Sequence, residues 1–273
     1  ESKGSKESDE EVRARTRDVE KLRADTTGWL RERIPRMIES ERVTASWAFF
    51  RSIGSPKRMV APMVNQSELP FRMLCRKYGS DCAYTPMYHS RIFALRESYR
   101  EQFTTVPEDR PLFVQFCGNE PDLLLQAAEL VADRCDAVDL NLGCPQGIAR
   151  TGYYGSYLQE NPRLIYNLVS CLYRQLRVPV TVKIRLLDDL DETIRYARML
   201  EEAGAALVAV HGRTRDQKGH QSGRADWAKI RRVKEALRVP VIANGSVEVF
   251  EDVSDCDHDA AADGLMSASG LLR

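Results

Sequence analysis

Asp139-Leu140-Asn141-Leu142-Gly143-Cys144-Pro145 is the stretch of this chain that is most informative about its fold. Its apolar residues, with Val138 before them, are typical of a strand that is covered on both faces. Gly143 ends the strand, and Pro145 cannot extend a β-ladder because it has no N–H. Cys144 is therefore predicted on a turn at the carboxyl end of a parallel strand, where α/β folds place their chemistry. The alternative is a structural thiol, since free cysteines are often buried.

Outward from this stretch, short strand-like runs alternate with helix-like patterns, which predicts a parallel sheet. One helix is expected from Pro121 to Leu130, and another from Asp191 to Leu200 with Gly204 at its end. Eight strand–helix repeats favour an α/β fold of the (β/α)8 TIM-barrel type over an open doubly wound sheet. The absence of a G-x-G-x-x-G motif after the first strand weakens the doubly wound alternative. The predicted strands are Met59–Met63, Cys82–Met87, Leu112–Cys117, Ala137–Leu142, Val178–Ile184, Leu207–His211, Val239–Ala243 and Gly264–Ala268.

The two ends of the chain differ from this pattern. Residues 1–45 are dense in charges of both signs and predict a helical or disordered extension, and residues 46–273 form the barrel domain. Trp47, Phe49 and Phe50 are expected to mark where the chain first packs on that domain. Only Gly270-Leu271-Leu272-Arg273 follows the eighth strand, so the sequence predicts a barrel that is truncated there, without a covering helix.

Composition limits the class of protein. A hydrophobic fraction of 43% is ordinary for a globular chain, and no apolar run is long enough for a membrane span. The 7 cysteines show no C-x₂-C spacing, so neither a metal site nor a disulfide framework is predicted. A reducing compartment, cytoplasmic or nuclear, fits best. Lys plus Arg equals Asp plus Glu at 40 each, which gives no support to a basic face for nucleic acid.

Polar residues recur at the predicted carboxyl ends of the strands. Lys183 lies in a strand otherwise suited to burial, so its ammonium must meet an anion or an electron-rich ligand, unless it forms a structural ion pair. His211 can donate to a ligand oxygen, or it is a satisfied core histidine. Gln115 carries donors and an acceptor that can contact the edge of a heterocycle.

The last two strands end in small residues, Asn244-Gly245-Ser246 and Ser267-Ala268-Ser269-Gly270. Such loops let backbone N–H groups approach an anion, and in this fold they often bind phosphate. A phosphate site together with a lysine, a histidine and a glutamine suits flavin mononucleotide (FMN). The thiol of Cys144 would then face a substrate stacked on the flavin and act as a general acid.

These residues together resemble the tRNA-dihydrouridine synthases, most closely the eukaryotic branch named for positions 16/17. The resemblance runs from about Arg58 to Gly270. The segments that carry it are Ala61-Pro62-Met63-Val64, Leu140-Asn141-Leu142-Gly143-Cys144-Pro145-Gln146, Gly152-Tyr153-Tyr154-Gly155-Ser156-Tyr157-Leu158, Val210-His211-Gly212-Arg213-Thr214 and Ala243-Asn244-Gly245.

The resemblance implies reduction of uridine to 5,6-dihydrouridine in tRNA, with FMN as cofactor and NADPH (or NADH) as reductant. Cys144 would protonate C5 of a uridine flipped into the pocket, after hydride delivery to C6. Asn141, Arg150 and Arg213 are the implied substrate contacts, although the arginines could equally be solvated. The residues that the resemblance assigns to FMN are Pro62, Met63, Val64, Gln115, Lys183, His211, Asn244, Gly245, Ser246, Ala268 and Ser269.

Two features depart from the family pattern. The family follows its barrel with a helical tRNA-binding domain that is expected to be absent from this chain, and Ser269 stands where relatives usually carry a charged residue. Two alternatives therefore stay open. One is a flavin oxidoreductase that acts on a free small pyrimidine, which suits zero net charge. The other is a truncated, non-catalytic fragment that retains RNA or protein binding.

Overall fold

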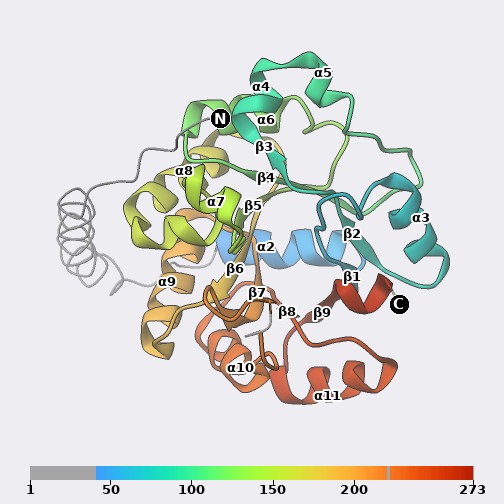
Figure 1. Ribbon diagram of the computed structural model, residues 1–273, viewed down its shortest axis with the longest axis vertical. Helices are drawn as coiled ribbons and strands as arrows, with labels where there is room; N and C mark the ends of the chain where they lie inside the picture. Colours follow the sequence, from blue (N-terminus) through green and yellow to red (C-terminus); the bar gives the residue numbers. More distant parts are fainter. Residues whose placement is uncertain (1–40, 220–221, 273) are drawn as a thin grey trace, which may run out of the picture.

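The computed structural model describes residues 41–219 and 222–272. In this part of the chain, eight parallel strands close into a barrel, because β2 pairs with both β1 and β4, and β1 also pairs with β9. Figure 1 shows the strands at the centre of the molecule with helices around them. The barrel strands are β1 (Arg58–Val60), β2 (Cys82–Tyr84), β4 (Leu112–Cys117), β5 (Ala137–Leu142), β6 (Val180–Leu186), β7 (Leu207–Thr214), β8 (Val241–Asn244) and β9 (Gly264–Ser267).

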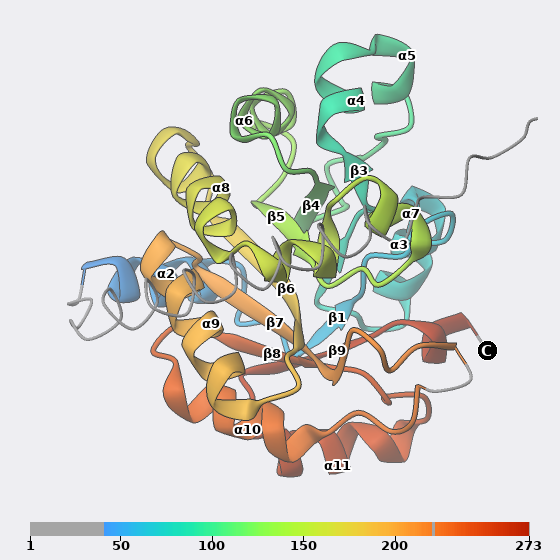
Figure 2. The same ribbon diagram turned by 60° about the vertical axis from the view of Figure 1, so that its left-hand side comes forward.

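Helices connect the strands and cover the outside of the barrel (Figure 2). A short strand, β3 (Tyr88–His89), pairs with β4 only and lies outside the barrel ring. The helices are α2 (Glu41–Ser52), α3 (Leu69–Lys77), α4 (Ser90–Leu95), α5 (Glu97–Arg100), α6 (Pro121–Glu129), α7 (Gly147–Thr151), α8 (Pro162–Gln175), α9 (Leu190–Ala203), α10 (Trp227–Ala236) and α11 (Phe250–Ala260), with 3₁₀ turns η1 (Gly155–Glu160) and η3 (Ser269–Leu272).

Alternating side chains of the strands build two cores. In β5, Val138 and Leu140 belong to the outer core beneath the helices, whereas Ala137 belongs to the inner core of the barrel. The inner core is apolar near the amino ends of the strands. Farther along, the inward positions of three adjacent strands become polar. Gln115 of β4, Asp139 of β5 and Thr181 of β6 are register partners in turn, and Lys183 is the next inward residue of β6.

Helix α2 covers the amino-terminal end of the barrel. Phe50 is 3% exposed and joins the inner core, and the ring of Phe49 lies 5.9 Å from that of Phe113. The indole N–H of Trp47 donates to the carbonyl oxygen of Arg238 at 2.7 Å. The predicted packing of this aromatic segment on the barrel is confirmed. Helix α2 also spans the predicted boundary between residues 45 and 46, and the rest of the predicted extension lies outside the described residues.

The predicted (β/α)8 barrel and the presence of its eight strands are confirmed. Two predicted strand ends, at Met63 and Met87, are three residues too late, since β1 ends at Val60 and β2 at Tyr84. Two predicted strand starts, at Val178 and Val239, are two residues too early, since the ladders begin at Val180 and Val241. Each of these follows a proline, which has no N–H to donate to a ladder. The predicted helices are confirmed as α6 and α9, and α9 ends at Gly204 with φ +112, where a Cβ would collide with the ring of Tyr173.

Among the helices within residues 41–219 and 222–272, none is both long enough and apolar enough to cross a bilayer.

Candidate active site at the mouth of the barrel

Strand register brings the predicted polar residues to one end of the barrel. Asn141 of β5 is the register partner of Lys183 of β6. Farther along, Arg185 of β6 is paired with His211 of β7, which is paired with Asn244 of β8. Because all these strands are parallel, their carboxyl ends meet at the same mouth.

A cavity of about 220 Å³ opens at this mouth beneath the ends of β1, β6, β7, β8 and β9. It takes in much of the predicted cofactor set and also Arg213, which was predicted to contact substrate. It does not take in Met63, Val64 or Gln115. The predicted residues that line the cavity are Pro62, Lys183, His211, Arg213, Asn244, Gly245, Ser246, Ala268 and Ser269.

The turn after β8 forms one wall of the cavity. Gly245 has φ +105 and Ser246 has φ +57, so two successive residues adopt left-handed backbone conformations. A Cβ on Gly245 would lie 2.7 Å from Cδ2 of His211, so only glycine lets the turn approach that ring. The hydroxyl of Ser246 accepts from the guanidinium of Arg213 at 2.8 Å, which places a cation beside the turn. The amide of Asn244 donates to the carbonyl oxygen of Met266 and ties this turn to β9.

His211 is held as a neutral imidazole. Burial lowers its pKa well below the ordinary value, and the positive charges of Lys183, Arg185 and Arg213 lower the pKa further. Nη1 of Arg213 lies 3.1 Å from Nε2 of His211. A guanidinium can only donate, so Nε2 is the accepting nitrogen and the ring proton sits on Nδ1. The neutral imidazole therefore carries its one N–H at Nδ1.

Lys183 is half-buried at the base of the cavity. Burial and, next, the charge of Arg185 lower the pKa of its ammonium to about 8, against the opposing effect of Asp139. At neutral pH the group is therefore mostly charged, although its hold on the proton is weakened. A cation in this position stabilises negative charge that develops on a bound ring.

Cys144 lies on the turn after β5, as the sequence predicted, and its side chain is half-buried. Its backbone N–H donates to Oδ1 of Asn141 at 2.9 Å, and its carbonyl oxygen accepts from Ser156. Gly155 has φ +64, and a Cβ there would lie 2.9 Å from Cβ of Cys144. Arg185 fixes the same turn from the other side, because its Nε donates to the carbonyl oxygen of Gly143 at 2.9 Å.

Two predicted contacts lie deeper than expected. Gln115 is 0% exposed, and its amide bonds to Asp139 and to Asn141 inside the barrel. Asn141 is 8% exposed and uses its amide on Gln115 and on the Cys144 turn. Their side chains therefore build the support of the cysteine, in addition to any contact with a ligand.

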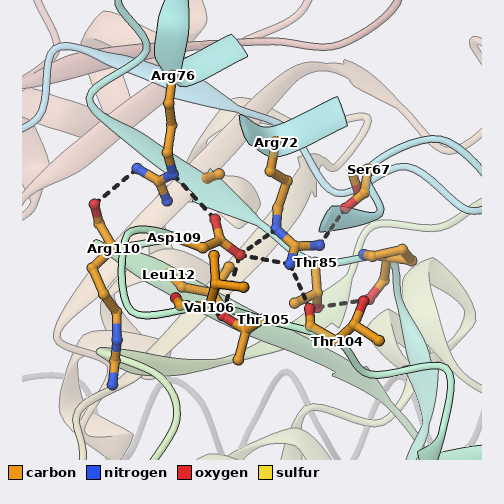
Figure 3. A network of polar contacts seen from close by, with 12 residues as sticks. Ser67, Arg72, Arg76, Thr85, Thr104, Thr105, Val106, Asp109, Arg110 and Leu112 are labelled. Carbon is orange, nitrogen blue, oxygen red and sulfur yellow. Dashed lines mark hydrogen bonds and ion pairs between the residues drawn. The ribbon is translucent and has the colours of Figure 1, made fainter. Parts of the chain in front are cut away.

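The loop after β1 is anchored by a buried ionic network (Figure 3). The hydroxyl of Ser67 accepts from the backbone N–H of Met63 at 2.9 Å. Arg72, 1% exposed, donates to the carbonyl oxygen of Ser67 at 2.7 Å and to Asp109 at 2.6 Å. Arg76 donates to the second oxygen of Asp109 at 3.1 Å. The network ties the loop to α3 and to the segment that carries Asp109, while the side chain of Val64 in the loop is 57% exposed.

An apolar wall on the Cys144 side of the mouth was missed by sequence reasoning. Cys117 and Tyr154 are buried together, and Met87 and Cys144 pack against them. The ring of His89 lies 5.4 Å from that of Tyr154, edge to face. Tyr154 belongs to one of the segments that carry the family resemblance, and that membership is the sequence signal from which this wall could have been predicted. The predicted substrate contact Arg150 lies on α7 and is exposed.

The family profile described as "Dihydrouridine synthase (Dus)" matches residues 59–273. The chain is 49% identical over 229 residues to tRNA-dihydrouridine(16/17) synthase, NAD(P)(+), of Schizosaccharomyces pombe, covering 82% of this chain and 57% of that protein. It is 51% identical to the Saccharomyces cerevisiae protein of the same name, covering 82% and 54%.

A second group of relatives is less similar. The human protein named tRNA-dihydrouridine(20a/20b) synthase, NAD(P)+, -like is 38% identical, covering 80% of this chain and 69% of that protein. The chain spans about half the length of the 16/17 relatives that it matches. Among solved structures, a 2-naphthoyl-CoA reductase complex matches with a TM-score of 0.55 and 13% identity, covering 78% of this chain and 47% of that one. This last likeness concerns the fold alone.

Proposed function

The chain belongs to the dihydrouridine synthase family, and from that premise we propose that it reduces uridine to 5,6-dihydrouridine in tRNA with FMN and NADPH. One observation carries the proposal: a fixed cysteine turn and a cationic, glycine-lined cavity share one barrel mouth, with Lys183 between them. A reductase that stacks a pyrimidine on a flavin needs this pairing of a proton donor and a cofactor pocket.

The residues that line the cavity offer hydrogen-bond donors and a positive charge that suit FMN. At its phosphate end, Gly245 and Ser246 present a turn that a Cβ at Gly245 would fill, and Arg213 supplies a positive charge. At its ring end, Lys183 and the neutral His211 offer donors to carbonyl oxygens and ring nitrogens. When bound, FMN would accept reducing equivalents from NADPH and supply the hydride that C6 of uracil receives.

The residues of the chain would carry the proton chemistry. The thiol of Cys144 would give its proton to C5 of uracil, so that the C5–H bond forms as the S–H bond breaks. The thiolate that remains would lie within the field of Lys183 and Arg185, because the pKa values of both these groups respond to charge at Cys144. Both cations would stabilise the thiolate until it takes a proton from solvent.

The likeness to the two groups of relatives supports a target position. Relatives named for positions 16/17 are 48% to 51% identical to this chain, whereas those named for 20a/20b are 36% to 38% identical. We therefore extend the proposal to the uridines at positions 16 and 17 of tRNA. The target uridine would have to leave the base stack in order to reach Cys144.

Enzyme assays with unmodified tRNA test the proposal. The purified chain should show flavin absorption bands near roughly 370 and 450 nm that NADPH bleaches, and it should form dihydrouridine at positions 16 and 17. Cys144→Ala should keep flavin reduction by NADPH but lower dihydrouridine formation by about 10² or more. Cys171→Ala is the matched control, because that thiol lies on α8, away from the mouth.

Each outcome has a clear meaning. Full dihydrouridine formation by Cys144→Ala would reject the acid role of the thiol. Reduction of free uridine monophosphate without reduction of tRNA would replace the tRNA substrate with a small molecule. A folded chain that binds no flavin would reject the cofactor.

A further inference from the structure

A directed chain of hydrogen bonds runs through the barrel interior to the cysteine turn. The hydroxyl of Thr181 donates to Oδ1 of Asp139 at 2.6 Å, and Nε2 of Gln115 donates to Oδ2 at 2.8 Å. Nδ2 of Asn141 donates to Oε1 of Gln115 at 2.9 Å, and the backbone N–H of Cys144 donates to Oδ1 of Asn141 at 2.9 Å. The chain begins at a buried carboxylate and ends at the proposed acid.

The two ends of this hydrogen-bond chain fix the direction of every hydrogen bond between them. An ionised carboxylate only accepts, so Gln115 must turn its NH₂ group to Asp139 and its oxygen to Asn141. Asn141 must then turn its NH₂ to Gln115 and its oxygen to the turn. Backbone N–H groups only donate, so the turn after β5 requires that oxygen. Neither amide can flip without leaving two buried groups unpaired.

We propose that Asp139 is a positioning residue for Cys144, and that it acts by fixing the orientation of the amides of Gln115 and Asn141. This inference rests on the proposed function for its kinetic consequence, but not for its structural one. Asp139 touches neither the cavity nor the thiol, and its influence passes through two side chains that are themselves buried. A loosened turn would move the thiol away from C5, and small misplacements of reacting groups slow reactions strongly.

The surroundings of Asp139 are consistent with a carboxylate kept for orientation. The carboxyl is 0% exposed, and burial raises its pKa to about 6, while the bonds from Thr181 and Gln115 and the charge of Lys183 favour the ionised form. The titratable side chains that face it are Lys183 from β6 and Tyr84 from β2. The group is therefore ionised at neutral pH, as the directed chain requires.

Three variants separate orientation from simple loss of packing. Asp139→Leu keeps a branched side chain but has no acceptor. Asp139→Asn keeps an oxygen for Gln115 and can turn its NH₂ to the hydroxyl of Thr181. Thr181→Val is the matched control, because it removes the other bond to the same carboxylate and leaves the amide chain intact. Thermal melting and flavin absorption are recorded for each variant, so that only folded proteins with the same flavin content are compared.

Two readouts are then measured, and the second needs no bound flavin. The first is dihydrouridine formation, which should fall about tenfold or more in Asp139→Leu and stay within about threefold of wild type in Asp139→Asn and Thr181→Val. The second is alkylation of Cys144 by iodoacetamide without tRNA, followed by mass spectrometry with the Cys171 peptide as internal reference. Alkylation should be about threefold faster in Asp139→Leu only, because a loosened turn exposes the thiol.

The alkylation readout does not depend on the proposed function. If wild-type protein made no dihydrouridine, the proposed function would fail, yet faster alkylation in Asp139→Leu would still support the positioning role. Unchanged alkylation in folded Asp139→Leu would overturn that role. An Asp139→Asn protein as impaired as the leucine variant would also overturn it, since charge rather than an accepting oxygen would then matter. If Asp139→Leu does not fold, Gln115→Met interrupts the same chain and must speed alkylation equally.

Discussion

Lys183 shows how a single buried ammonium at the mouth of the barrel lowers the stability of the folded protein. Its ammonium is drawn into the base of the cavity, and burial is the largest cause of the lowered pKa, which falls from an ordinary 10.5 to about 8. The unfolded chain holds this proton up to a higher pH than the folded protein does. Between these two values folding releases the proton, so stability rises with pH in that window; below about pH 8 both states are charged and the folded state bears the full cost.

Lys183→Met is accordingly expected to stabilise the flavin-free protein. At pH 7 the free energy of unfolding should rise by about 2 kcal/mol, less than the full pKa gap implies because the ammonium reaches the open cavity. Stability of the variant should also lose the rise with pH that wild type shows above about pH 8. Urea unfolding at pH 7 and at pH 9.5 checks both points. The exposed Lys77→Met is the control, and a less stable Lys183→Met protein at pH 7 would contradict the argument.

Sequence reasoning reached most residues of the cavity because few structural roles explain a polar residue at the end of an apolar strand. It could not show that Gln115 also bonds to side chains of a neighbouring strand, Asp139 and Asn141. Arg213 was assigned to substrate, although the period of two along a strand places it on the same face as His211. The structure places both in the cavity.

At the scale of elements, the loop after β1 depends on a helix and a distant loop. Asp109 is 0% exposed and pairs with Arg72 and Arg76, and through Arg72 it reaches Ser67, which holds the backbone of Met63. A buried pair like this contributes little net stability compared with an apolar pair, but removal of one partner leaves a charge uncompensated.

Asp109→Asn should therefore be costly. We expect a loss of about 3 to 5 kcal/mol in the free energy of unfolding, measured by urea titration. Glu120→Gln breaks the exposed ion pair with Arg91 and should change stability by no more than about 1 kcal/mol. FMN affinity should also fall in Asp109→Asn, because the loop that carries Pro62 is no longer held. Equal stability of the two variants would show that burial of this network has no energetic consequence.

The types of the secondary-structure elements were predictable, whereas the bounds of several strands and the irregular segment from β3 to α5 were not. Hydrophobic periodicity locates the strands, but the prolines at 179 and 240 delay two ladders by removing donors that periodicity does not register. The segment from β3 to α5 interrupts the strand–helix rhythm with pieces of two to six residues. Pieces this short carry no period, and they owe their shape to packing between Tyr88, Phe93, Tyr99 and Phe103.

For the whole molecule, closure of the sheet joins the turn that carries Cys144 and the turn after β8 at one mouth. These features come from β5 and β8, which are far apart in the sequence, and only a closed ring brings their ends together. Ligand binding should thus stabilise the barrel as a unit.

FMN is expected to raise the melting temperature of the flavin-free protein. At about 100 times its dissociation constant it should add about 2.7 kcal/mol of stability, or roughly 5 to 10 °C for a domain of this size. Riboflavin at the same concentration should give a smaller shift, because it has no phosphate to meet Gly245, Ser246 and Arg213. Differential scanning fluorimetry measures both, and equal shifts would remove the phosphate role from this turn.

Helix α2 also bears on the order in which the protein assembles. Its Arg42 donates to the carbonyl oxygen of Glu202, and its Trp47 donates to that of Arg238, partners that lie 160 and 191 positions later in the chain. Synthesis runs from the amino end, so α2 leaves the ribosome well before the strands that it covers. The contacts with Glu202 and Arg238 therefore form only after most of the barrel has been made, and until then part of the apolar floor that α2 covers stays open to other chains.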